Sequence, residues 1–80
     1  MNPAAQSRVS ALPLSPREKE IVSLLLEDLP DKAIADRLKL THDTVRTYSK
    51  HIRRKLGVQS RVGVALVAVG YTHLGIKTKS

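Results

Sequence analysis

Basic side chains recur along residues 42–56 at spacings that would place them on one side of a helix. At 100° per residue they share an arc of about 100°, and they are Arg46, Lys50, Arg53 and Arg54. Like charges at these spacings repel one another by about 0.2–0.5 kcal/mol per pair, and no acid follows Asp43 in this segment. The pattern therefore indicates a polyanionic partner rather than a solvated face that only aids solubility.

The opposite side of residues 42–56 is suited to a protein core, because most of its members are apolar: Val45, Tyr48, Ser49, Ile52 and Leu56. A predicted helix and a short turn precede this segment, as in a helix-turn-helix, whose second helix reads base edges with its N-terminal half. Arg46 and Lys50 lie in that half and can each donate to guanine O6 and N7, and Thr47 can contact a base edge or a thymine methyl. We therefore predict that Arg46, Thr47 and Lys50 contact bases in the major groove.

Other polar side chains are expected to hold DNA phosphates, which position a protein without reading sequence. Arg53 and Arg54 continue the basic arc beyond the base-reading half. Lys32 and Arg61 stand at the starts of the flanking helices and can hold phosphates beside helix N-termini. The predicted phosphate contacts are Lys32, Thr44, Tyr48, Arg53, Arg54 and Arg61.

Capping signals divide the chain beyond residue 14 into four predicted helices. The string Ser-Pro-Arg-Glu at 15–18 offers a cap, a proline for the first helical position and a capping box. Thr41 and Ser60 can cap two later helices, and Gly57 suits the left-handed conformation that ends one. The helices are expected over residues 16–28, 31–38, 42–56 and 61–73. The fold class is all-α, a four-helix bundle-like domain with a central helix-turn-helix.

The last predicted helix, residues 61–73, carries two apolar faces. Val62, Ala65, Leu66 and Val69 line one of them. The other is nearly opposite, and we predict that it forms a homodimer interface, because an exposed apolar patch usually marks one. Gly63 and Gly70 would permit a close approach of two helices. The predicted interface residues are Val64, Val67, Tyr71 and Leu74.

Composition limits the chain to one small domain with a modest core, since it has 80 residues. Its net charge is +7, most of the positive excess lies in residues 32–61, residues 1–31 are slightly acidic, and Lys77 and Lys79 make the tail basic. Without cysteine it has neither disulfides nor thiolate metal sites. The start does not resemble a signal peptide, and no apolar stretch approaches the ~20 residues of a membrane span. We expect a soluble, cytoplasmic protein without a membrane partner.

The histidines give no sign of catalysis or metal binding. His42, His51 and His73 are dispersed, with no carboxylate cluster or glycine-rich loop to serve them. We therefore expect no catalytic residue, no metal and no cofactor, and the chain is not expected to be an enzyme.

A family resemblance extends over residues 14–74. The strings at 14–22 (LSPREKEIV), 32–35 (KAIA), 44–46 (TVR) and 55–58 (KLGV), followed by Arg61, resemble the LuxR-type (GerE-like) helix-turn-helix domain of bacterial transcription regulators. The resemblance implies a DNA-binding dimer, with residues 42–56 in the major groove and the last helix at the dimer contact. The base-contacting positions of that family fall on Arg46, Thr47 and Lys50.

The chain departs from the family pattern near the second predicted helix. Pro30 and Ala33 replace a usual Ser and Glu that cap this helix, and Asp28 stands where Gly is usual, so the connection before it is expected to differ. Tyr48 occupies a position that is often His. None of these changes removes a predicted base contact.

The domain assignment is a lead-in or linker at 1–13, the LuxR-type domain at 14–74 and a basic tail at 75–80. Relatives with this domain usually carry an N-terminal receiver or ligand-binding domain, a candidate partner here together with double-stranded DNA and RNA polymerase. The linker-like start favours a fragment over a stand-alone regulator. Two other functions stay open: a sigma-factor region 4-like promoter-binding module, and a basic protein-interaction module.

Overall fold

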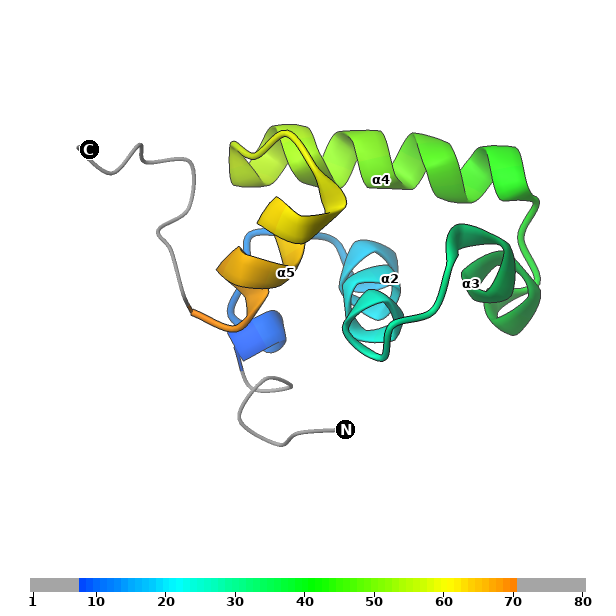
Figure 1. Ribbon diagram of the computed structural model, residues 1–80, viewed down its shortest axis with the longest axis horizontal. Coiled ribbons are helices and arrows are strands. Elements are labelled where there is room, and N and C mark those ends of the chain that lie inside the picture. Colours follow the sequence, from blue (N-terminus) through cyan, green and yellow to red (C-terminus); the bar gives the residue numbers. More distant parts are fainter. Residues whose placement is uncertain (1–7, 71–80) are drawn as a thin grey trace.

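The computed structural model describes residues 8–70, and within them the fold is all-α. Residues 8–10 form a short helical turn that the sequence did not predict. The main helices are α2 (Pro16–Leu26), α3 (Asp31–Leu38), α4 (His42–Leu56) and α5 (Arg61–Ala68). Figure 1 shows α4 lying along one side of the molecule, with α2, α3 and α5 beneath it. The all-α expectation is confirmed.

The helix that carries the basic arc has the predicted bounds, because both of its ends are capped as the sequence indicates. The Thr41 hydroxyl accepts a hydrogen bond from the Thr44 backbone N–H at 3.1 Å. At the other end Gly57 adopts φ 71°, a left-handed conformation that glycine tolerates without a steric penalty. These caps fix the length of α4 and therefore which side chains it presents to solvent.

An ion pair of a buried carboxylate links the start of α2 to the end of α4. Ser15 and Glu18 form the predicted capping box, with Glu18 Oε1 accepting from the Ser15 N–H at 2.9 Å. The same oxygen pairs with Lys55 Nζ at 2.8 Å, although Glu18 is only 4% exposed. The sequence predicted the cap but not this link between helices, because Lys55 is distant from Glu18 along the chain.

The Glu18 carboxylate makes the stability of the domain sensitive to acid. Burial alone would raise its pKa, but hydrogen bonds from Lys55 and Ser15 and the Lys55 charge outweigh burial, and the net effect lowers the pKa. A carboxyl group whose pKa is lowered by folding stabilises the folded state at any pH above its unfolded-state pKa. That stabilisation is lost as the pH falls through the pKa of the folded state.

Replacing this carboxylate should therefore make the free energy of unfolding less dependent on pH below neutrality. We expect Glu18→Gln to destabilise the domain by about 1–3 kcal/mol at neutral pH, because Lys55 loses a charged acceptor. The difference from wild type should shrink below the ordinary carboxyl pKa, as measured by urea unfolding from pH 7 to pH 3. Glu20→Gln, at an exposed position on the same helix, is the matched control and should change little. A constant gap at every pH would contradict the assigned role of Glu18.

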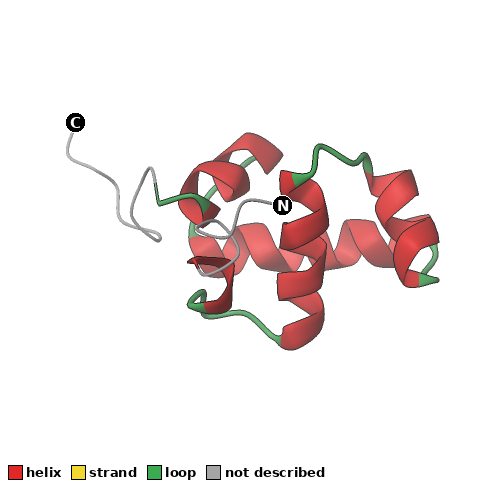
Figure 2. Ribbon diagram, turned by 90° about the horizontal axis from the view of Figure 1, so that it is seen from below, coloured by secondary structure: helices red, strands yellow, loops and turns green. Residues whose placement is uncertain are grey.

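The core lies where α4 crosses the other helices. Helix α4 packs against α2, α3 and α5, and Figure 2 shows the same helices from below, joined by short loops. The largest fully buried side chains come from all but the last helix: Ile21, Val22, Ile34, Val45, Ile52 and Leu56. The predicted apolar side of α4 is thus the side that holds it in place.

The residues before α2 belong to the folded unit, which corrects the expectation of a lead-in up to residue 13. Val9 is 3% exposed and Leu12 8%. The Ser10 carbonyl accepts from Lys19 Nζ at 2.7 Å, and the Arg8 guanidinium donates to the Val69 carbonyl. The sequence does not predict this helical turn, because a single turn with two buried apolar residues is too short to show a helical period. Residues 1–7 and the predicted tail at 75–80 lie outside the described residues.

The orientation of α5 corrects the predicted dimer face. Val64 is 2% exposed and Val67 5%, so both lie in the core of the single chain, where Val64 lines a small cavity together with Leu25 and Ile52. The opposite face is the exposed one, with Val62 at 66% and Val69 at 37%. A helix with two apolar faces does not reveal from sequence which face the core will cover. Tyr71 and Leu74 lie outside the described residues.

The two glycines of this region have roles within the chain. A Cβ on Gly63 would lie 2.8 Å from the Val58 Cβ, so the absence of a side chain lets α5 pack on the preceding turn. Gly70 adopts φ 81° beside the Arg8 guanidinium. The seven-residue spacing predicts a contact between two helices, whereas in the structure each glycine lies against a neighbouring side chain of the same chain.

Candidate nucleic-acid interface

The exposed side of α4 brings together the side chains predicted to read bases. We call this surface the recognition face, and its members are Asp43, Arg46, Thr47, Lys50 and Arg54, all exposed. On the other side Val45, Ile52 and Leu56 are at most 1% exposed. The helix therefore has no freedom to rotate its basic residues inward without exposing the core.

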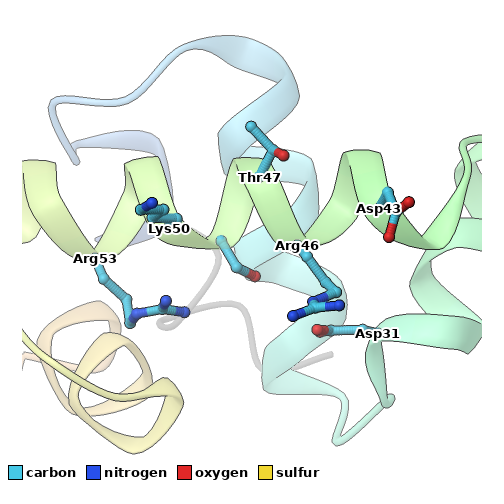
Figure 3. A pocket seen from close by; sticks show the side chains of 7 residues that line it. Asp31, Asp43, Arg46, Thr47, Lys50 and Arg53 are labelled. Atoms are coloured by element: carbon cyan, nitrogen blue, oxygen red, sulfur yellow. The ribbon is translucent and has the colours of Figure 1, made fainter.

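A notch borders the recognition face on the side of α3 and α5. Its volume is about 360 Å³, and Asp31 of α3 forms part of its wall. Figure 3 shows Arg46 and Arg53 directed from α4 toward this notch, whereas Thr47 is directed to the opposite side of the helix. The full lining is Asp31, Asp43, Arg46, Thr47, Ser49, Lys50 and Arg53.

A second hollow, of about 420 Å³, lies on the other flank of α4. Tyr48, half-buried, forms its floor together with Thr44, and the exposed His51 adjoins them. Asp43 and Thr47 line both hollows. The recognition face is therefore a ridge with a depression on each side, a shape that projects its side chains.

The predicted phosphate contacts are not equally available. Lys32 and Arg54 are exposed and Arg53 is half-exposed, so each can reach a phosphate. Thr44 is drawn into the cap of α4, because its hydroxyl accepts from the Thr41 hydroxyl at 2.8 Å. Because Thr44 is the acceptor in that bond, its own O–H remains a donor that a phosphate could accept from.

Arg61 is engaged inside the chain, which the sequence did not reveal. Its guanidinium pairs with Asp31 Oδ1 at 3.1 Å and also donates to the Leu29 carbonyl. The pair ties the start of α5 to the start of α3, and both side chains are partly covered. Arg61 thus links α5 to α3 in this structure, and its contact with a DNA phosphate stays a prediction.

The notch beside the recognition face contains two acidic side chains. Asp31 and Asp43 are the acids of the notch, and both lie in the first turns of their helices, where the helix dipole favours an acid. Against them stand the three cations of the lining, Arg46, Lys50 and Arg53. The surface is therefore suited to an anionic partner that contacts α4 lengthwise.

Two negative findings apply to the described residues. Between residues 8 and 70 no group of three His, Cys, Asp or Glu side chains is placed to hold a metal ion. No helix in that range is long and apolar enough to cross a membrane.

Comparison with known proteins gives a consistent result. The family described as bacterial regulatory proteins of the luxR family matches residues 12–68. The nitrate/nitrite response regulator protein NarL of Escherichia coli is 43% identical over 53 residues, which cover 66% of this chain and 24% of NarL. The probable HTH-type transcriptional regulator GfsR of Streptomyces halstedii is 43% identical over 61 residues, 76% of this chain and 25% of GfsR.

A third relative likewise matches most of this chain with a small part of its own length. The DNA-binding transcriptional activator DevR/DosR of Mycobacterium tuberculosis is 35% identical over 65 residues, 81% of this chain and 30% of that protein. The chain thus spans about a quarter of the length of these relatives. No solved structure gives a significant match.

Proposed function

The chain belongs to the luxR family of bacterial regulatory proteins, a family of DNA-binding transcription regulators, and we propose that it binds specific duplex sequences through α4. The observation that carries the proposal is the recognition face. A capped helix presents Arg46, Thr47 and Lys50 to solvent while three buried residues hold its other side. The width of a major groove admits one such helix.

The side chains of α4 divide the work of binding in this proposal. Arg46 and Lys50 donate to guanine acceptors, and Thr47 contacts a base edge or a thymine methyl. Arg53, Arg54 and Lys32 neutralise phosphates and set the register of the helix in the groove. Tyr48 and Thr44 flank the ridge and can add hydroxyl contacts to the backbone.

The test of this function is the dependence of duplex binding on salt and sequence. Sequences selected from a random pool should share a motif, and the wild-type chain should bind them more tightly than a scrambled duplex, as measured by fluorescence anisotropy. The logarithm of the binding constant should fall with the logarithm of salt concentration, with a slope of about 0.9 per phosphate contacted. A protein-interaction module would give no common motif, and that result would refute the proposal.

We further propose that α5 forms a homodimer through its exposed face, so that two copies of α4 read adjacent half-sites. Val62 on this helix and Val69, its C-cap, are exposed apolar residues, and the half-buried Leu66 lies between them. This is the face opposite to the one that the sequence suggested. A twofold contact of this kind repeats the same patch on both copies.

Charge on this face should prevent association without harming the fold. We expect Val62→Glu to shift the sedimentation of the chain from dimer to monomer at micromolar concentration. Gln59→Glu is the matched control, because Gln59 is exposed in the turn before α5 and carries the same change of charge. Equal sedimentation of wild type and Val62→Glu would argue against the α5 dimer.

The proposed partner domain, the RNA polymerase contact and the cytoplasmic location are inferred from the family and from the relatives. NarL is named a response regulator, and we propose that this domain likewise responds to a receiver or ligand-binding domain joined to its N-terminal side. RNA polymerase is the partner through which a bound regulator would alter transcription. A cytoplasmic location and the absence of enzymatic activity fit this function.

A further inference from the structure

Asp31 is an acid in a surface otherwise suited to bind an anion. It is the first residue of α3 and lies in the notch beside Arg46 and Arg53. Its side chain is 30% exposed, so it is neither a freely solvated charge nor a buried one. A carboxylate here repels DNA phosphates, and it lies close enough to the notch cations to act on them as well as on Arg61.

The carboxylate of Asp31 is held in position by Arg61 of α5. Arg61 donates to Asp31 Oδ1 at 3.1 Å and is itself fixed by the Leu29 carbonyl. A carboxylate has about four lone-pair sites, so Oδ2 keeps acceptor capacity after this pairing. Figure 3 shows the Arg46 guanidinium extended from α4 toward the Asp31 carboxylate across the notch.

This arrangement suits the way arginine reads a base. The guanidinium is a planar fork with five N–H donors, so one edge can face a carboxylate while another donates to guanine O6 and N7. A long side chain loses rotamer freedom when it binds, and a fixed counter-charge lets it lose part of that freedom in advance. Orientation by a carboxylate therefore sharpens the preference of Arg46 for its base.

We propose that Asp31 is a positioning residue that orients Arg46 for base reading, with Arg61 holding Asp31 in turn. The three side chains come from α5, α3 and α4, so the inference places a specificity determinant outside the recognition helix. It rests on the proposed function, since Arg46 must read a base for its orientation to matter.

The test is Asp31→Asn, which preserves the shape of the side chain and removes its charge. The readout is the ratio of dissociation constants for the selected duplex and for duplexes changed at one base pair. At the pair that Arg46 reads, we expect this ratio to fall about three- to tenfold, a part of what a bidentate contact supplies. Binding to a scrambled duplex should become tighter, because a negative charge leaves the DNA-facing surface.

Asp36→Asn separates orientation from net charge. Asp36 is exposed on the same helix and is not part of the notch lining, so this variant should leave the discrimination ratio at wild-type level. In an Arg46→Ala background, Asp31→Asn should no longer change the ratio at that base pair. A merely structural role would instead weaken binding to every duplex by the same factor and leave the discrimination ratio at that base pair unchanged.

The possible results separate the two proposals. If the wild-type chain shows no sequence preference, the proposed function itself fails. If it shows one and Asp31→Asn leaves the ratio at every base pair unchanged, the positioning role is overturned, as it is by independent effects of Asp31→Asn and Arg46→Ala. If Asp31→Asn does not fold by circular dichroism, Asp31→Ser at the same helix start is measured against the same two outcomes.

Discussion

Removing the Arg46 side chain is expected to weaken binding to the preferred duplex about 5- to 150-fold, which corresponds to the ~1–3 kcal/mol of a bidentate base contact. The loss should be confined to one base pair, because Arg46 is exposed near the start of α4, in the part of a recognition helix that meets base edges. Measuring Arg46→Ala against all single-base variants of the duplex would show a flat preference at that position and an unchanged one elsewhere.

Arg54→Ala is the matched control for this experiment. Arg54 is an exposed arginine on the same helix, two turns closer to its C-terminal end. Its loss should weaken all duplexes about equally and lower the salt slope by about 0.9, as expected for one phosphate contact. A loss of preference at one base pair in Arg54→Ala, or a uniform loss in Arg46→Ala, would reverse the roles assigned to the two arginines.

A glutamate at Val67 is expected to unfold most of the chain at neutral pH. Val67 is 5% exposed and belongs to the core, so the substitution would place an unpaired carboxylate there at a cost of several kcal/mol. A domain this small has only about 5 kcal/mol of stability. Circular dichroism should show a large loss of helical signal, and DNA binding should disappear with it.

Val62→Glu provides the comparison on the same helix. Val62 is 66% exposed, so this variant should keep its helical signal and its melting transition while losing only the self-association proposed above. A folded Val67→Glu monomer would mean that α5 lies the other way round, with Val64 and Val67 at an interface. The pair of variants therefore decides the orientation of α5 independently of DNA.

Local signals of the sequence were sufficient for the starts of the four main helices and for the exposed side of α4, whereas α2 and α5 end at Leu26 and Ala68, earlier than the predicted 28 and 73. The caps at Ser15 and Thr41 and the stop at Gly57 are short-range features, and the structure has all three. The side of α4 that faces the core followed from one apolar stripe, because that helix has a single such stripe and a strongly basic remainder. The role of each exposed side chain toward DNA stays a prediction.

What the sequence could not supply depended on contacts between distant parts of the chain. The pairs Glu18–Lys55 and Asp31–Arg61 join different helices, and no spacing rule connects them. The faces of α5 were assigned wrongly because both are apolar, so only packing decides between them. Asp31 entered the candidate site for the same reason, since α3 brings it beside α4 only in the folded chain.

The contact between Arg8 and the Val69 carbonyl, reinforced by the burial of Val9, has a mechanical consequence. It closes a loop of 61 residues, and the entropy of closing a loop rises with its length. An exposed contact of this kind is expected to open before a capped helix such as α4 loses its backbone hydrogen bonds. A pull on the chain ahead of Arg8 would therefore be felt first at the end of α5, whereas α4 would keep its shape. If α5 pairs two copies as proposed, tension on the N-terminal side would weaken that pairing before it reached the recognition face.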